Sequence, residues 1–318
     1  MGLIVSMFGF TEDQERRIQE AAPGWEVLFG KPRDIPKERF LEAEIVCGWH
    51  PAVVQGGALE DGAKLKWVQA GSAGVDNLPL DRFADRGIVL TTASGVHPVQ
   101  MAETAFAMML SFTRNLHHAV RNQAAGKWER AETYTELRGR TIGIVGAGQI
   151  GAEIARIAQA FGMNTVGIRR TGQAAPFFDH MKTMDKLDEV LAESDVVVNI
   201  LPGTDETYLL FDARAFERMK SQAIFINIGR GTSVDTDALT AALQQGRIAG
   251  AGLDVFDPEP LPEGHPLWSL DNVIVTPHIG GMTDKYKERM ADLFVENLRA
   301  YLHQGAPAKN RVDYEQRY

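Results

Sequence analysis

The sequence contains very little cysteine. Its single residue of this kind, Cys47, lies in the mostly apolar run 44–47. One cysteine cannot form a disulfide within its own chain, and the zinc-ligand spacings that need several cysteines are absent. We therefore interpret Cys47 as a small buried apolar side chain, and we expect a reducing, cytoplasmic setting and no metal site.

Basic clusters and long apolar runs are also absent. The 318 residues carry 33 Lys and Arg against 42 Asp and Glu, a formal net charge of −9. An acidic excess without a basic run argues against a nucleic-acid-binding or membrane-surface protein. No apolar run approaches the roughly 20 residues of a transmembrane helix, and the apolar start 1–10 lacks the basic flank of a secretory signal. We expect a soluble chain, long enough for two domains.

Short apolar runs alternate with helical patterns along most of the chain. The apolar runs predict buried strands at 3–7, 44–48, 67–69, 89–91, 141–145, 165–168, 196–201, 223–228, 250–255 and 273–276. The helical patterns predict helices at 11–20, 98–123, 149–161, 187–192, 213–219, 237–245 and 284–303. This alternation is typical of parallel sheets covered by helices on both faces, so the predicted fold class is α/β. The segment 98–123 is apolar on most sides, which predicts a buried helix that joins two domains or packs against a second subunit.

A glycine-rich turn at 146–151 reads G-A-G-Q-I-G and fits the pattern G-x-G-x-x-G between a predicted strand and a predicted helix. In such a turn Gly146 permits the tight bend, Gly148 lets the backbone approach a pyrophosphate, and Gly151 lets helix and strand pack closely. The free N–H groups of the helix N-terminus then bind the diphosphate. The sequence predicts a dinucleotide site here, and the alternative is a purely structural turn.

The end of the next strand bears on which dinucleotide binds. An acidic residue there would accept the 2′-hydroxyl of NAD, but the chain has Arg169, Arg170 and Thr171 at this point and no acid before Asp179. Two guanidinium groups beside a hydroxyl suit a 2′-phosphate. We therefore predict a preference for NADP(H), with NAD(H) still possible. The alternative is a pair of solvated arginines at a strand end.

Three chemically active side chains follow three successive predicted strands near the C-terminus. Arg230, Glu259 and His278 come after the strands at 223–228, 250–255 and 273–276. Ligands of open α/β sheets lie at this carboxyl edge, so the three side chains are expected to converge. The arginine suits an anionic substrate and its carbonyl, the histidine suits protonation of an alkoxide, and the carboxylate would orient the histidine. Taken singly, each has an ordinary alternative: a helix cap, an exposed loop acid or a satisfied surface histidine.

Several segments in this order resemble the D-isomer-specific 2-hydroxyacid dehydrogenases, which include glyoxylate/hydroxypyruvate reductases and phosphoglycerate dehydrogenases. The matching segments are 71–76, 101–103, 146–151, 201–202, 227–231, 252–260 and 277–281. The likeness spans most of the chain and is strongest from Ser72 to Gly281. It implies an NAD(P)-dependent enzyme that reduces a small 2-oxo acid to the D-2-hydroxy acid.

The resemblance also implies a role for each matched residue. The backbone amides of Ser72, Ala73 and Gly74 would hold the substrate carboxylate. Arg230 would be the substrate-binding catalytic arginine and His278 the acid–base, with Glu259 as its partner. Asp254 would bond the nicotinamide carboxamide, and the further cofactor-binding residues would be Gln149, Ile150, Leu201, Pro202, Thr207, Ile228, Gly229 and Gly280. Trp49 precedes a loop of the N-terminal part and is a candidate substrate contact, with ordinary packing as its alternative.

The architecture implied by the resemblance is two Rossmann-like domains. A dinucleotide-binding domain at 96–284 would be inserted into a flavodoxin-like substrate domain formed by 1–95 and 285–318. A homodimer is implied through the cofactor domain and the helix at 98–123. The only other partner expected is the small 2-oxo or 2-hydroxy acid.

Some alternatives stay open at this stage. The stretch 95–101 departs from the small-residue run of many members, which leaves the subgroup open. Related formate dehydrogenases carry glutamine as the partner of the catalytic histidine, so Glu259 argues against them, and the arginine pair fits a phosphite-oxidising relative less well than an NADPH-consuming reductase. A dinucleotide-sensing regulatory protein without turnover is the alternative from another class. Glyoxylate, hydroxypyruvate, a branched 2-oxo acid and 2-ketopantoate all remain candidate substrates.

Overall fold

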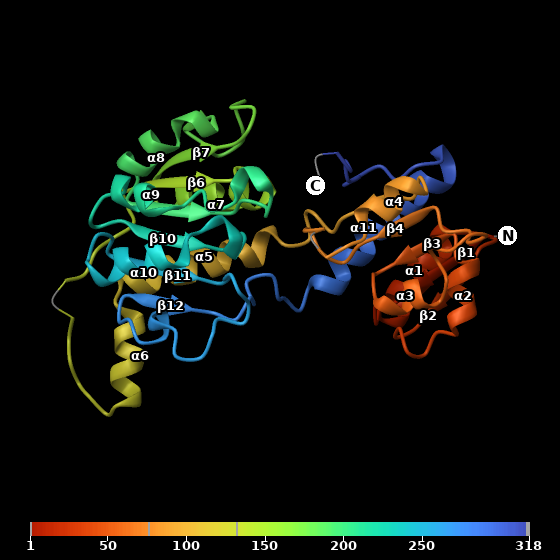
Figure 1. Cartoon of the computed structure of the whole chain (residues 1–318), viewed down its shortest axis with the longest axis horizontal. Helices are drawn as coiled ribbons and strands as arrows, with labels where there is room; N and C mark the ends of the chain where they lie inside the picture. Colours follow the sequence, from red (N-terminus) through yellow and green to blue (C-terminus); the bar gives the residue numbers. More distant parts are fainter. Residues whose placement is uncertain (1, 76, 132, 316–318) are drawn as a thin grey trace. The chain divides into compact units, whose positions relative to one another are not determined.

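The computed structural model describes residues 2–75, 77–131 and 133–315, and the chain divides into two compact units. The split unit comprises Met1–His97 and Thr283–Tyr318, and the inserted unit comprises Pro98–Met282. Figure 1 shows the chain leaving the split unit in orange and returning to it in blue. The boundaries between the two units fall at 97/98 and 282/283. The sequence resemblance implied domain boundaries at 95/96 and 284/285. Within the described residues, no helix is long and apolar enough to cross a membrane.

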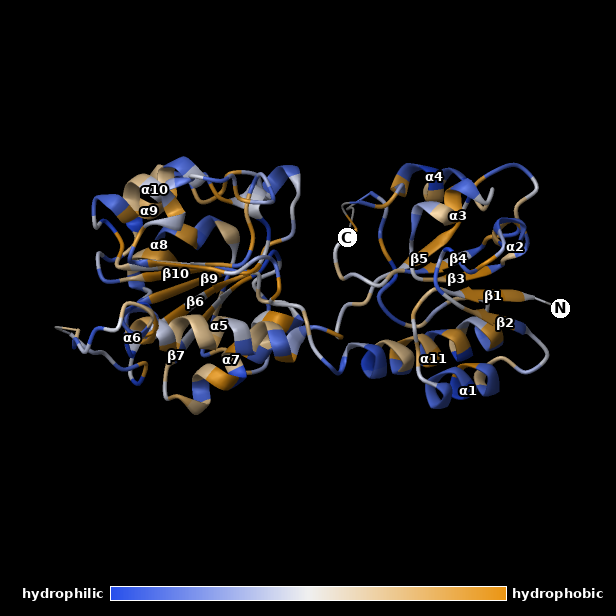
Figure 2. Cartoon of the chain, turned by 90° about the horizontal axis from the view of Figure 1, so that it is seen from below, coloured by the Kyte–Doolittle hydropathy of each residue, from blue (hydrophilic) through white to orange (hydrophobic). Residues whose placement is uncertain are grey.

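The split unit contains one parallel sheet of five strands. The strands are β1 (Leu3–Ser6), β2 (Glu26–Phe29), β3 (Ile45–Cys47), β4 (Trp67–Gln69) and β5 (Val89–Thr91). Their order is β2-β1-β3-β4-β5, the order of a flavodoxin-like doubly wound sheet. The helices α2 (Lys37–Glu42), α3 (Pro51–Gln55) and α4 (Leu80–Asp85) lie over one face, and α1 (Glu12–Ala21) and α11 (Tyr286–Gln304) lie over the other (Figure 2).

Alternation of side chains along the strands explains the two layers of helices. Val46 faces the same core as Phe40 of α2, whereas its neighbour Ile45 faces the core that contains Ile18 of α1 and Phe294 of α11. All five side chains are fully buried. Both faces of the strands are therefore apolar, which is why they read as continuous apolar runs in the sequence.

The inserted unit contains a parallel sheet of seven strands. They are β6 (Thr141–Val145), β7 (Asn164–Ile168), β8 (His180–Lys182), β9 (Val196–Asn199), β10 (Ile224–Asn227), β11 (Gly250–Leu253) and β12 (Val273–Val275). Their order is β12-β11-β10-β9-β6-β7-β8, which reverses direction between β6 and β9. In a doubly wound sheet this reversal opens a crevice at the carboxyl ends of the strands, where ligands bind.

Helices cover both faces of this sheet as well. In Figure 2, α5 (Pro98–Thr113) and α7 (Gln149–Ala160) lie on one side, and α8 (Leu187–Glu193), α9 (Ala213–Arg218) and α10 (Thr236–Gln244) lie on the other. The short 3-10 turns are η1 (Met184–Lys186), η2 (Asp205–Thr207), η3 (Gly231–Ser233) and η4 (Pro266–Trp268). The predicted α/β class with two Rossmann-like parallel sheets is confirmed.

One predicted helix is wrong, and two strands were not predicted. The segment 98–123 forms two helices, α5 and α6 (Leu116–Ala124), because Asn115 between them adopts a left-handed backbone with φ of 52°. The unpredicted strands β2 and β8 lie at sheet edges and are only partly buried: β8 has no apolar run, and that of β2 is limited to Val27–Phe29. The tail, which has no periodicity, forms an antiparallel bridge from Arg311 to Thr91 at the outer edge of β5.

Candidate active site

The glycine turn between β6 and α7 has the shape that its sequence predicts. Gly146 has φ of 106°, and a Cβ there would lie 2.9 Å from the carbonyl carbon of Ile200. A Cβ on Gly151 would lie 2.9 Å from the carbonyl oxygen of Gly146, so only glycine lets helix and turn approach this closely. The space beside Gly148 is open to 4 Å, and no side chain caps the start of α7. The uncapped N–H groups and this open space fit a diphosphate.

The end of β7 offers a second feature that suits a phosphate. Arg169 donates from Nη2 to the carbonyl oxygen of Ala174 at 3.2 Å. Its Nε is buried and has no hydrogen-bond partner within the described residues. Such an unsatisfied donor is costly, and a phosphate oxygen would satisfy it. Arg170 and Thr171 follow on the surface.

Five more of the predicted cofactor residues, Leu201, Pro202, Thr207, Ile228 and Gly229, follow β9 and β10 at their carboxyl ends. Thr207 closes the turn after β9, because its hydroxyl donates to the carbonyl oxygen of Pro202 at 2.6 Å. Gly229 packs against Leu201, and a Cβ on it would lie 2.8 Å from the Leu201 carbonyl oxygen. Ile228 is buried, 2% exposed. The sheet thus places these residues beside the reversal between β6 and β9.

His278 and Glu259 form a hydrogen-bonded pair. His278 Nδ1 lies 2.8 Å from Glu259 Oε2, and Glu259 Oε1 accepts from the Phe256 N–H at 2.9 Å. The two side chains are 54% and 37% exposed, so the Nε2 edge of the ring is accessible to a small molecule. A histidine that donates from Nδ1 to a carboxylate keeps Nε2 for proton transfer. The geometry therefore suits an oriented acid–base.

Asp254 holds the backbone on either side of His278. Its buried carboxylate, 1% exposed, accepts from the Thr276 hydroxyl at 2.6 Å, from the Ile279 N–H at 2.9 Å and from the Gly280 N–H at 2.9 Å. His278 itself adopts φ of 52°, which is uncommon for a residue with a side chain. The loop is thus kept in a sparsely populated conformation by a buried carboxylate. This bonding was not predicted, and a bond from Asp254 to a nicotinamide carboxamide stays a prediction.

The turn that carries Arg230 packs directly against the loop that carries Glu259. A Cβ on Gly231 would lie 1.9 Å from the carbonyl carbon of Phe256, so the two backbones touch at this point. Arg230 donates from Nη1 to the carbonyl oxygen of Gly229 at 2.9 Å. The adjacent strands β10, β11 and β12 therefore bring the predicted arginine, carboxylate and histidine to one edge of the sheet.

The predicted carboxylate-binding loop lies in the split unit, after β4. Ser72 and Ala73 are exposed, and the Ser72 hydroxyl donates to the carbonyl oxygen of Gly74 at 2.6 Å. Tyr286 of α11 donates to the carbonyl oxygen of Gly71 at 2.6 Å, a contact that sequence reasoning missed because 215 residues separate the two. Asp76, which ends this motif, lies outside the described residues.

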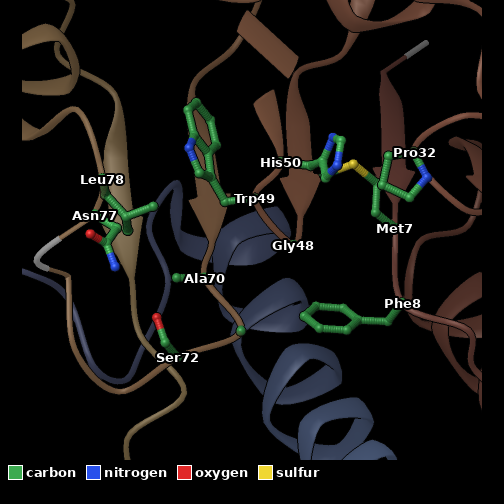
Figure 3. A pocket seen from close by; sticks show the side chains of 11 residues that line it. Met7, Phe8, Pro32, Gly48, Trp49, His50, Ala70, Ser72, Asn77 and Leu78 are labelled. Atoms are coloured by element: carbon green, nitrogen blue, oxygen red, sulfur yellow. The ribbon is translucent and has the colours of Figure 1, made fainter. Parts of the chain in front are cut away.

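A pocket of about 360 Å³ adjoins this loop within the split unit (Figure 3). Its lining combines apolar and polar side chains, namely those of Met7, Phe8, Trp49 and Leu78 with those of His50, Ser72 and Asn77. The Trp49 ring packs edge-on against Phe83, with centroids 4.9 Å apart. Trp49 thus combines ordinary packing with a place in the pocket, and its contact with substrate stays a prediction.

Comparisons with known proteins show which family the chain is similar to. The family model described as D-isomer specific 2-hydroxyacid dehydrogenase, NAD binding domain, matches residues 106–280. Glyoxylate/hydroxypyruvate reductase B of Escherichia coli (strain SMS-3-5 / SECEC) is 40% identical over 311 residues, 95% of each chain.

Two solved structures are similar over almost their whole length. One is a D-isomer specific 2-hydroxyacid dehydrogenase family protein from Aeromonas salmonicida, with a TM-score of 0.85, 34% identity and coverage of 98% of this chain and 99% of that chain. The other is an NADPH-dependent glyoxylate/hydroxypyruvate reductase from Sinorhizobium meliloti, in complex with NADP and malonate, with a TM-score of 0.75, 30% identity and coverage of 98% and 97%. The chain therefore belongs to the D-isomer specific 2-hydroxyacid dehydrogenase family and is an NAD(P)-dependent dehydrogenase.

Proposed function

We propose that the chain reduces a small 2-oxo acid of the glyoxylate or hydroxypyruvate type to the D-2-hydroxy acid, with NADPH as the hydride donor. The observation that carries this proposal is the His278–Glu259 pair, 2.8 Å apart, at the sheet edge that also carries Arg230. The relative from Escherichia coli and the structure from Sinorhizobium meliloti are both named for these two substrates.

Each residue has a defined task in this reaction. Arg230 binds the anionic substrate and polarises its carbonyl, and the amides of Ser72 and Ala73 bind the carboxylate. The reduced nicotinamide, when bound, supplies the hydride to the carbonyl carbon. His278 gives the proton on Nε2 to the carbonyl oxygen and afterwards takes a proton from solvent. Glu259 accepts from Nδ1–H and so holds the ring in its orientation.

The residues that would hold the cofactor are already grouped in the inserted unit. The open space beside Gly148 and the uncapped start of α7 suit the diphosphate. The buried, unpartnered Nε of Arg169 supports a 2′-phosphate and hence NADPH over NADH. Arg170 and Thr171, on the surface beside it, are its proposed companions.

The test of this function is oxidation of NADPH and of NADH, followed at the nicotinamide absorbance. The substrates are glyoxylate, hydroxypyruvate, 2-ketopantoate and phenylpyruvate. We expect turnover with NADPH on glyoxylate or hydroxypyruvate. Tight NADPH binding without turnover on any of the four would instead favour a regulatory dinucleotide-binding protein.

The cofactor preference has its own test. Arg169→Asp should weaken NADPH binding by roughly 10- to 100-fold, since a charge-assisted hydrogen bond is lost and a like charge is placed beside the phosphate. NADH binding should change far less. The measurement is the Kd of each cofactor by fluorescence titration. Arg218→Asp is the matched control, because Arg218 ends α9 and precedes β10 at the opposite edge of the sheet; equal losses for both cofactors would contradict the assignment.

We further propose that two copies associate through the inserted unit. Exposed apolar side chains are concentrated along 116–134: Leu116 is 55% exposed, Val120 56%, Trp128 96% and Tyr134 51%. Exposed apolar surface of this kind is typical of an interaction site.

Sedimentation equilibrium should give twice the chain mass of 35.0 kDa, and Val120→Asp combined with Trp128→Ser should give the monomer. Trp268→Ser, at another exposed tryptophan of the unit, is the control, and a monomeric unmodified protein would refute the proposal.

A further inference from the structure

Three polar side chains are buried at the carboxyl ends of β9 and β10 in the inserted unit. They are Asn199, Asn227 and Ser233, which are 0%, 1% and 0% exposed. Asn199 Nδ2 donates to Asn227 Oδ1 at 3.0 Å and to Ser233 Oγ at 2.7 Å. Both N–H groups of the Asn199 amide are therefore used within this group, which we call the amide–hydroxyl network.

The network bonds to the backbone at two turns. On the β9 side, Asn199 Oδ1 accepts from the Leu201 N–H at 3.1 Å. On the β10 side, Asn227 Oδ1 accepts from the Gly229 N–H at 3.1 Å. The carbonyl oxygen of Arg230 accepts from Ser233 Oγ at 2.7 Å and from Asn227 Nδ2 at 3.3 Å. One connected set of bonds thus links the turn at Leu201 to the turn that carries Arg230.

Two side-chain donors, together with the Ser233 N–H at 3.4 Å, bind the Arg230 carbonyl oxygen and fix the orientation of this peptide. The next residue, Gly231, is at the same time in backbone contact with Phe256, whose N–H binds Glu259. The start of the Arg230 side chain is therefore set relative to the loop of the acid–base pair. Fully satisfied buried networks are rigid, and a displacement of about 1 Å at a site can cost about 100-fold in rate.

We propose that Asn199, Asn227 and Ser233 are positioning residues, which hold Arg230 in the geometry for substrate binding and couple its turn to the cofactor-side turn at Leu201. This inference rests on the proposed function of Arg230. It assigns the three side chains a task in the reaction rather than in folding alone.

A buried serine elsewhere in the same unit supplies the comparison. Ser194, 0% exposed, precedes β9 at the opposite edge of the sheet, and its hydroxyl donates to the carbonyl oxygen of Val190 at 2.6 Å. This bond stays within the end of α8. It lies at the amino end of β9, whereas the Arg230 turn lies at the carboxyl end of the sheet. Ser194→Ala therefore removes a buried hydroxyl without touching the network.

Ser233→Ala is the direct test. It removes the shorter of the two side-chain bonds to the Arg230 carbonyl and leaves one N–H of Asn199 without its acceptor. We expect kcat/KM for the 2-oxo acid to fall by roughly 10- to 100-fold, mostly through a higher KM, while the Kd of NADPH changes by less than about threefold. Ser194→Ala should lose a similar amount of thermal stability and keep its kinetic constants. Ser233→Cys keeps a weak donor, so its KM should lie between that of Ser233→Ala and that of the unmodified protein.

Asn227→Asp is the second variant and is needed if Ser233→Ala does not fold. It has nearly the same shape but turns an acceptor towards the Arg230 carbonyl in place of a donor, so the same rise in KM is expected. Unchanged KM and kcat in a folded Ser233→Ala or Asn227→Asp protein would overturn the inference, and so would loss of folding in both. If Arg230→Ala also kept full activity, the proposed function, and not only the network, would have failed.

Discussion

His278→Ala is expected to lower kcat by roughly 10²- to 10⁴-fold, because it removes the proposed proton donor to the carbonyl oxygen. The affinity for NADPH should stay near that of the unmodified protein, since the diphosphate features lie at the start of α7 and not in the His278 loop. The measurements are kcat from NADPH oxidation at saturating substrate and the Kd of NADPH by fluorescence titration. A variant within a few-fold of full turnover would remove His278 from the mechanism.

A second histidine provides the control for this experiment. His265 also lies in the inserted unit, and its Nδ1 accepts from the Leu267 N–H at 3.3 Å at the start of η4. His265→Ala should leave kcat unchanged. The kcat of Glu259→Gln should fall between those of the two histidine variants, because an amide oxygen still accepts from the Phe256 N–H but the amide NH2 does not accept from His278 Nδ1. This order of effects would separate loss of the acid–base from loss of its orientation.

Arg230→Ala is the other change with a large expected effect. Removing the group that polarises the carbonyl should lower kcat by roughly 10²- to 10³-fold, and loss of the anion-binding contact should raise KM as well. Steady-state kinetics with glyoxylate and hydroxypyruvate give both constants. The Tm should change little, because the side chain lies at a strand end and not in either core.

Arg230→Lys is the matched variant. Lysine keeps the charge but lacks the planar fork that bonds a carboxylate or carbonyl at two points. Its KM should be lower than that of Arg230→Ala, whereas its kcat should stay almost as low. Equal kinetic constants for Arg230→Ala and the unmodified protein would show that another group binds the substrate. The positioning role proposed for the amide–hydroxyl network would then also be wrong.

Much of the fold could be predicted because central parallel strands are buried on both faces. The strands β4, β5 and β6 were predicted at their observed bounds, since each is mostly apolar and largely buried. The missed strands β2 and β8 are edge strands that are only partly buried, and β8 has no apolar run, whereas the better-buried edge strand β5 was found. The break between α5 and α6 was missed because it depends on one residue, Asn115, in a left-handed conformation whose amide donates to the carbonyl oxygen of Thr133.

The positions of the candidate side chains at one edge of the sheet could be predicted from the sequence, but the bonds around them could not. Arg230, Glu259 and His278 each follow a strand, and topology alone brings such positions to one edge. The bonds that hold these side chains in place were not visible in the sequence. Asp254 and Asn199 bond to neighbouring strand ends, and such pairings depend on the strand order and on buried backbone groups. Polar residues at the ends of apolar strands were the available signal, and Asn199 and Asn227 carry it.

The division of the chain also has a consequence for the order of its synthesis. The inserted unit is one continuous segment, Pro98–Met282, so all of its strands emerge from the ribosome before α11 does. The split unit needs α11, because Met290, Phe294 and Leu298 fill the core beneath Ile45 and Trp67. Since domains fold as units during translation, the nucleotide half can be complete while the other half still exposes one face of its sheet. The half with the predicted carboxylate-binding loop is therefore the last to mature, and a chain that ended before residue 286 would carry a complete inserted unit without a finished split unit.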